Sequence, residues 1–133
     1  PDYAKLTCDT RYTDYALLEE VLPKLHAIAD KQYVPDTKTV MKTVTEFQSM
    51  DELPGTAALL KLVQEAAAEC NLPQPTAKAV GGGSDSAYTT AAGVPTICAI
   101  GVQGARNHTA EEFAVVDTLF SRCKLFATIM LNI

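Results

Sequence analysis

The pattern of hydrophobic and polar positions divides the chain into two sections, and the first reads as β-α-β. Residues 3–12 alternate between apolar and polar side chains, which predicts a half-buried strand. Apolar residues then recur at helical spacing from about Asp14 to Gln32, although Pro23 interrupts the run. Thr13 or Asp14 is expected to cap this helix. The stretch Thr37–Phe47 is rich in β-branched residues and predicts a second strand.

The second section begins after a cluster of turn-forming residues at Met50–Gly55, which marks the expected domain boundary. Four elements are then expected in the order helix, strand, helix, strand, over Thr56–Asn71, Thr76–Val80, Asp85–Ala92 and Val94–Gly101. The last of these is a short apolar run closed by glycine, which favours a buried parallel strand. The alternation of helices and strands is typical of an α/β fold.

A final helix is expected to run to Asn132, with Asp117 as its cap. The residues expected on its inward face are Leu119, Phe120, Cys123, Phe126, Ala127 and Met130. The first section, at about fifty residues, is too small to form a stable unit alone, because it buries little and leaves strand edges open. It therefore needs further strands from elsewhere.

Composition narrows the classes of partner. The net charge is −5, with 11 Lys and Arg scattered among 16 Asp and Glu, and this argues against a nucleic-acid partner. No apolar run reaches the roughly 18 residues that span a bilayer, so no membrane partner is expected. The four cysteines form no C-x-x-C pair. We expect free, mostly buried thiols in a cytoplasmic protein.

A glycine-rich loop is the first candidate for chemistry. The sequence GGGSD at Gly81–Asp85 follows a predicted strand and precedes a predicted helix. Glycines there let backbone N–H groups approach an oxyanion or a carboxylate. The alternative is a tight strand-to-helix turn in which Ser84 or Asp85 serves as the cap. Neither a G-x-G-x-x-G nor a P-loop pattern is present, so a phosphate site is weakly supported.

Two further side chains are candidates, and each has a plain structural alternative. His108 follows the predicted buried strand, at the strand end where open α/β sheets bind ligands, and a neutral imidazole there can bind zinc. The alternative, and the more common case for a histidine in a loop, is a hydrogen-bonded structural residue. Arg11 stands next but one to Asp9 and either forms an exposed ion pair or offers a planar fork to a carboxylate. One histidine alone does not make a hydrolytic zinc site.

These motifs together resemble a known family. The segment GGGSDSAYTTAAGVPTICAIGVQGARNHTAEEF resembles the C-terminal signature of the dinuclear zinc aminoacylase and carboxypeptidase family, with the glutamate carboxypeptidase branch as the nearest match. That family also includes acetylornithine deacetylase and succinyl-diaminopimelate desuccinylase. The opening PDYAKLTCDTRY is similar to a strand of the family's lid domain.

The resemblance implies a fold and an assembly. Residues 50–133 would be the C-terminal portion of a zinc-exopeptidase-like α/β catalytic domain. Residues 1–49 would be the β-α-β part of an α+β lid and dimerisation domain, which accounts for its incomplete appearance. The full-length protein would be a homodimer through this lid.

The resemblance also implies roles for individual residues. His108 matches the histidine that binds one zinc ion of the pair. Arg11 matches the lid arginine that grips the terminal carboxylate of the substrate. Gly83 and Ser84 match loop positions that line the substrate pocket. The family's other zinc ligands and its general base have no counterpart here, so no catalytic residue is assigned to this chain.

The implied activity is that of a metallopeptidase of carboxypeptidase or dipeptidase type, which hydrolyses an amide bond next to a free carboxylate in a peptide or an N-acyl amino acid. Two zinc ions would serve the full-length enzyme. The isolated chain is expected to be an inactive fragment with weak zinc affinity, because it holds one ligand. Alternatives are an N-acyl amino acid deacylase, a non-catalytic dimerisation module, and a small-ligand regulatory domain built on the glycine loop.

Overall fold

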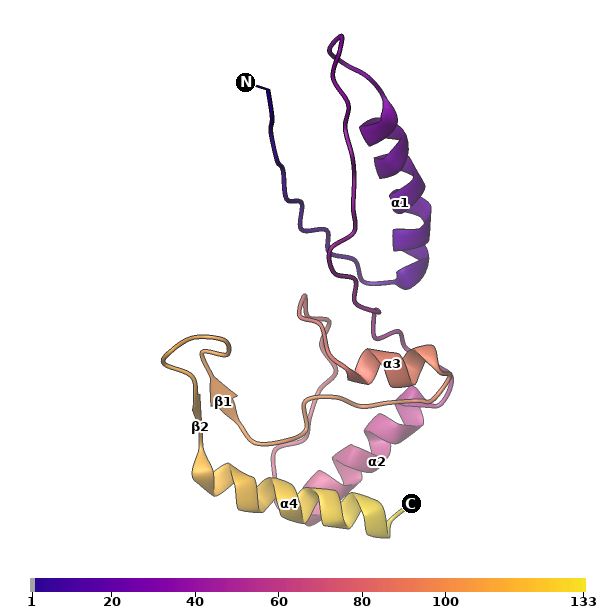
Figure 1. The fold of residues 1–133 in the computed structure, drawn as a ribbon. Helices are drawn as coiled ribbons and strands as arrows, with labels where there is room; N and C mark the ends of the chain where they lie inside the picture. The colour runs from indigo at the N-terminus through magenta and orange to yellow at the C-terminus, as the bar shows by residue number, and fades with distance from the viewer. Residues whose placement is uncertain (1) are drawn as a thin grey trace.

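The computed structural model describes residues 2–133, so Pro1, which opens the expected lid section, lies outside the described residues. The elements in chain order are α1 (Tyr15–Asp30), α2 (Thr56–Glu69), α3 (Ser86–Ala91), β1 (Gly104–Ala105), β2 (Phe113–Ala114) and α4 (Val116–Leu131). Figure 1 shows α1 and two extended segments rising from a body formed by α2, α3, α4 and the β1–β2 hairpin. Helices with a small sheet are compatible with the α/β class.

Helix α1 confirms the first helical prediction. Its N-cap is Asp14, whose Oδ1 accepts a hydrogen bond of 2.8 Å from the backbone N–H of Ala16. The side chain thus satisfies one of the N–H groups that the first turn leaves free. Pro23 lies inside the helix without ending it. Leu18 is the buried residue of α1, while Ile28, expected on the same apolar stripe, is 57% exposed.

The four predicted strands are wrong in the sense that no β-ladder forms over 3–12, 37–47, 76–80 or 94–101. A strand is stabilised by a neighbour that pairs with its backbone N–H and C=O groups. Among residues 2–133, no backbone hydrogen bond joins the first two segments, which run as extended chain beside α1 (Figure 1). In the last segment, Ala99 has a left-handed φ of 60°, which interrupts an extended conformation. The only sheet in residues 2–133 is the antiparallel β1–β2 pair, with Gly104 opposite Ala114.

The core lies between α2 and α4. Its buried members are Val63, Ala66, Ala67, Leu125 and Ile129. The small alanines of α2 let α4 approach closely, so that Leu125 is fully buried. Polar contacts flank this core, since Cys70 Sγ lies 3.3 Å from Thr128 Oγ1 and Asn132 donates a 3.3 Å hydrogen bond to Glu69. Ile97 and Ile100 also pack against it, and they fix the segment that precedes the hairpin.

Helix α4 forms where it was predicted, but its buried face was predicted wrongly. The residues expected to face inward are exposed, for example Phe120 at 72% and Met130 at 73%. This helix is apolar around most of its circumference, so periodicity offers two overlapping stripes and only contact with α2 selects one. Asp117 also lies in the first turn rather than at the cap, which Val115 occupies. The negative charge of Asp117 still interacts favourably with the positive N-terminal end of the helix dipole.

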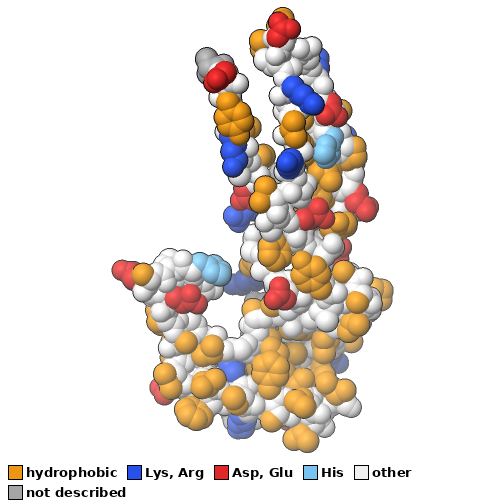
Figure 2. Space-filling view, in the orientation of Figure 1, with side chains coloured by type: hydrophobic (Ala, Val, Ile, Leu, Met, Phe, Trp, Pro, Cys, Tyr) orange, Lys and Arg blue, Asp and Glu red, His pale blue; other side chains and the backbone are white. Residues whose placement is uncertain are grey.

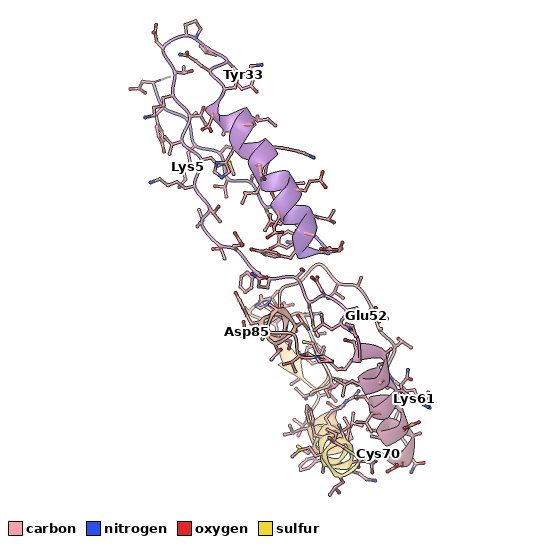
Figure 3. The ribbon with its side chains drawn as sticks, turned by 90° about the vertical axis from the view of Figure 1, so that its right-hand side faces the viewer. Lys5, Tyr33, Glu52, Lys61, Cys70 and Asp85 are labelled. Atoms are coloured by element: carbon pink, nitrogen blue, oxygen red, sulfur yellow. The ribbon has the colours of Figure 1, made fainter. Side chains whose placement is uncertain are left out.

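The chain exposes far more surface than a compact monomer of its mass. Its accessible area is 10677 Å², against about 6,800 Å² expected for a compact protein of this size. Figure 2 shows apolar side chains spread over the lower body as well as the raised section. Figure 3 shows the elongated shape, with Lys5 and Tyr33 in the raised section and Lys61 and Cys70 far from them in the body. Much apolar surface is therefore left for other protein to cover.

The α2–α4 contact predicts a contrast between two faces of one helix. Leu125→Ala should lower the free energy of unfolding by about 2–5 kcal/mol, because it removes a fully buried side chain from the only extensive helix–helix contact in residues 2–133. Phe120→Ala, on the exposed face, should cost much less. Urea unfolding followed by circular dichroism measures both. Equal losses would contradict this packing.

Candidate functional site

The structure brings Arg11 to the glycine loop across the two sections of the chain. The Arg11 NH1 group donates a 3.1 Å hydrogen bond to the backbone carbonyl of Gly81. Its Nε and NH2 groups both donate to Oδ2 of Asp9, at 3.2 Å each. The exposed ion pair considered from the sequence is confirmed, and its guanidinium also points at the predicted loop.

Gly83 lies against Phe47. A Cβ atom built at Gly83 would lie 3.4 Å from the Phe47 ring, which is van der Waals contact. The backbone of Phe47 is tied down in turn, because its carbonyl accepts a hydrogen bond from the Tyr12 hydroxyl. Sequence reasoning missed Phe47, since nothing in its spacing marks a contact with a residue 36 positions away.

Ser84 contacts the start of α3 and also a thiol. Its Oγ accepts a 3.2 Å hydrogen bond from the backbone N–H of Ser86, the first residue of α3. The N-cap position is Asp85, whose side chain makes no capping hydrogen bond, so Ser84 contributes from one residue before the cap. The same Oγ lies 3.1 Å from Sγ of Cys98. Hydrogen bonds from the side chains of Ser84 and then Ser86 lower the pKa of the Cys98 thiol below its ordinary value, against a smaller opposing effect of burial. Cys98 is half-buried, so reagents can reach it.

The other thiols only partly match expectation. All four cysteines are free, as predicted. Cys70 is buried, but Cys8 and Cys123 are exposed, so the expectation of mostly buried thiols is wrong. Cys8 lies on an extended segment without a covering neighbour, and Cys123 lies on the uncovered face of α4.

His108 lies in the loop between β1 and β2, in an unusual backbone conformation. Its φ is 65°, and that of Arg106 is 61°, in the left-handed region that few residues other than glycine adopt and in which histidine is found more often than arginine. The backbone N–H of His108 donates a 3.0 Å hydrogen bond to Oε2 of Glu112, and Arg106 forms an ion pair with Glu111. The two glutamates therefore brace this loop, and the following helix α4 begins after them at Val116. At the base of the hairpin, a Cβ at Gly104 would clash with the carbonyl of Phe113.

A hollow of about 330 Å³ adjoins the imidazole. Its lining residues are Val102, Gly104, Asn107, His108, Glu112, Phe113 and Ala114. No hydrogen bond or ion pair within residues 2–133 links His108 to Arg11, Gly83 or Ser84. The structure thus brings Arg11 into contact with the glycine loop. His108 lies apart from both, beside the hollow next to the hairpin.

The side chains in residues 2–133 do not by themselves fit a zinc site. No three His, Cys, Asp or Glu residues among them cluster closely enough to hold a metal ion. A structural or catalytic zinc ion needs at least three protein ligands, and His108 with Glu112 supplies two donors at most.

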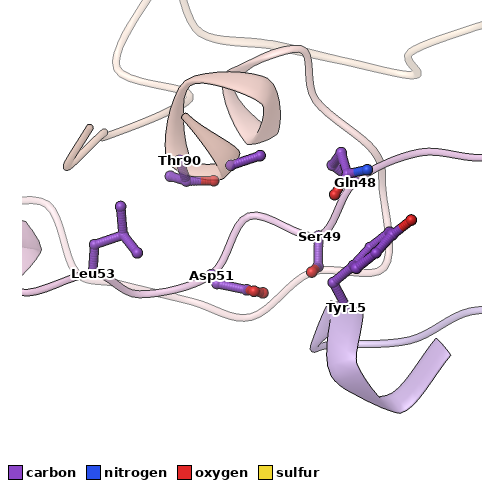
Figure 4. Close-up of a pocket in the computed structure, with 7 residues that line it drawn as sticks. Tyr15, Gln48, Ser49, Asp51, Leu53 and Thr90 are labelled. Atoms are coloured by element: carbon purple, nitrogen blue, oxygen red, sulfur yellow. The ribbon is translucent and has the colours of Figure 1, made fainter. Parts of the chain in front are cut away.

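A second hollow lies where the two sections join, and Figure 4 shows it between the start of α1, the 48–53 segment and α3. Its volume is about 230 Å³. Ser49 Oγ and Asp51 Oδ1 are buried there without a hydrogen-bond partner in the protein. Thr90, also in the wall, is satisfied by its bond to the carbonyl of Ala87.

Comparison with known protein families shows to which family this chain belongs. The model of peptidase family M20/M25/M40 matches residues 18–132, which is most of the chain. The chain belongs to peptidase family M20/M25/M40. This family comprises hydrolytic metallopeptidases that act on peptides and generally bind zinc, so the resemblance of the glycine loop and the histidine loop is confirmed at the level of the family. No curated protein and no solved structure matches this M20 chain.

The matched range matters for the candidate residues. It contains the glycine loop and the His108 loop, whereas Arg11 precedes its first residue. Arg11 therefore depends on its own observed contact with Gly81 for its place in the site. Among residues 2–133, no helix of this M20 chain has the length and apolar character needed to cross a membrane.

The Ser84–Cys98 contact predicts a pH-dependent reactivity. Because hydrogen bonding lowers the folded-state pKa of Cys98, its reactive thiolate is populated at lower pH than that of an ordinary cysteine. Ser84→Ala should raise that pKa and slow alkylation of Cys98 by iodoacetamide near neutral pH. Mass spectrometry of the modified peptides measures this, with Cys123 as the internal control. An unchanged Cys98 profile would contradict the hydrogen bond.

Proposed function

We propose that this chain forms part of a zinc-dependent metallopeptidase that hydrolyses an amide bond next to a free carboxylate, as a carboxypeptidase or dipeptidase does. The observation that carries the proposal is the 3.1 Å hydrogen bond from Arg11 to the carbonyl of Gly81. It supports a guanidinium fork beside the glycine loop that lies within the family match. A planar fork with several donors suits a carboxylate ligand.

Each candidate residue then has a distinct task. Arg11 holds the substrate carboxylate and so orients the scissile amide. Gly83 leaves space for the substrate backbone beside Phe47. Ser84 offers a hydroxyl just before the N-terminus of α3. His108 supplies one zinc ligand from the hairpin loop, where it lines a hollow together with Glu112 and Phe113.

The proposal also assigns the two sections of the chain to different domains. Residues 1–49 belong to a lid and dimerisation domain and residues 50–133 to a catalytic domain, with the complete enzyme a cytoplasmic homodimer. The large exposed area of the chain supports a need for further protein around it. Two zinc ions, when bound in the complete enzyme, would polarise the amide carbonyl and activate water. The general base is not among the residues of this chain.

Deacylation of an N-acyl amino acid is the nearest alternative, because it also cleaves an amide beside a carboxylate and uses the same Arg11 contact. A non-catalytic dimerisation module is an alternative of another class. It is favoured by the unpaired extended segments 3–12 and 37–47. The two classes differ in whether the chain recognises a free carboxylate at all.

Carboxylate recognition is tested by ligand binding rather than turnover. N-acetylglutamate should bind the chain through Arg11, and Arg11→Ala should weaken binding about tenfold, as expected for loss of a charge-assisted hydrogen bond. NMR titration measures this, with Arg122→Ala as the charge-matched control and the dimethyl ester of the ligand as the carboxylate control. Equal binding by Arg11→Ala and the unmodified chain would refute the proposed role.

Zinc retention is tested separately. The isolated chain should be inactive and should lose zinc on dialysis, because no three potential ligands cluster around His108 or elsewhere in residues 2–133. In a longer protein that joins this chain to further zinc ligands, His108→Ala should lower the zinc content measured by atomic emission, while Asn107→Ala should leave it unchanged. Peptidase activity of the isolated chain that a chelator abolishes would contradict this prediction.

A further inference from the structure

Asp9 already supplies a carboxylate to the guanidinium that is proposed to receive the substrate. The two residues stand two positions apart on an extended segment, which places both side chains on one face. Oδ2 of Asp9 accepts from Nε and from NH2 of Arg11, at 3.2 Å each. The remaining nitrogen, NH1, is bonded to Gly81. Every nitrogen of the fork therefore has a partner within the chain.

The pair is held loosely enough to open. The side chains of Arg11 and Asp9 are 69% and 74% exposed. Solvent screens such pairs, and they contribute only about 0–1 kcal/mol. A ligand carboxylate can therefore displace Asp9, but it must replace those hydrogen bonds and approach a fixed negative charge.

We propose that Asp9 is an internal competitor that occupies Arg11 until a substrate carboxylate displaces it, and so tunes the affinity of the site for carboxylates. The inference rests on the proposed role of Arg11. Competition by Asp9 favours ligands that also contact the glycine loop. A ligand with only a carboxylate gains little binding free energy, because it replaces one carboxylate partner of Arg11 with another. Asp9 touches Arg11 and is not a catalytic residue.

The two possible roles of Asp9, competitor for Arg11 or support for its position, predict opposite effects of replacing it. A residue that merely positions Arg11 should weaken ligand binding when it is replaced. A competitor should strengthen it. Asp9→Asn keeps the size of the side chain and removes its charge, so binding of N-acetylglutamate and of acetate should tighten by roughly twofold to fivefold, the range of an exposed ion pair.

The experiment uses the full chain with Asp2→Asn as control, since Asp2 carries the same charge on the same segment. NMR titration at constant ionic strength gives the affinities, and the Arg11 Nε–Hε resonance reports the ion pair directly without ligand. In Asp9→Asn that resonance should shift and exchange faster with water, while Asp2→Asn should leave it unchanged. The double variant Asp9→Asn with Arg11→Ala should lose the gain.

The outcomes separate the inference from the proposed function. If Arg11→Ala weakens binding but Asp9→Asn leaves it unchanged or weaker, Arg11 keeps its role and the competitor is refuted. If Arg11→Ala has no effect, the proposed function fails and the inference fails with it. An unchanged Nε–Hε resonance in Asp9→Asn would refute the ion pair itself, whatever the titrations show.

Discussion

The packing of α2 against α4 is the contact on which the rest of the molecule depends. Val63, Ala66 and Ala67 meet Leu125 and Ile129 in the main cluster of buried side chains in residues 2–133. Everything that carries chemistry in the second section lies on the chain between these helices. The glycine loop, α3 and the hairpin all lie between α2 and α4 in the chain, and Leu72, Ile97 and Ile100 tie this stretch to the core.

Ile97 and Ile100 show how the framework reaches the site. They pack against the α2–α4 core, and Cys98 between them turns to Ser84 on the glycine loop. The loop is thus held from one side by the core and approached from the other by Arg11 and Phe47. The hairpin that carries His108 leaves the same framework farther along. Arg11 and His108 accordingly lie on different parts of the chain, and no hydrogen bond among residues 2–133 joins them.

The uncovered surface fits membership of a peptidase family whose zinc sites need several ligands. The apolar stripe of α4 that contains Phe120 and Met130 faces solvent, and the segments 3–12 and 37–47 have no strand to pair with. Among residues 2–133, no three potential metal ligands cluster, whereas the exposed guanidinium of Arg11 lies beside the glycine loop. The local geometry therefore supports the proposed recognition of a substrate carboxylate more directly than it supports catalysis.

The sequence alone determined the helices, a cap for α1 at Thr13 or Asp14 and the family, because helical periodicity, capping and a loop motif are local properties of a few neighbouring residues. It named Arg11, Gly83, Ser84 and His108 from motif order, although their roles remain proposals. Only the tertiary structure decided which stripe of α4 is buried and that Phe47 lies on Gly83. It also decided that Asp9 and Gly81 share Arg11. These contacts join residues that are distant in sequence or compete for one partner, and only packing in three dimensions settles such choices. The expected strands failed for the same reason, since a strand depends on a neighbour that local sequence does not provide.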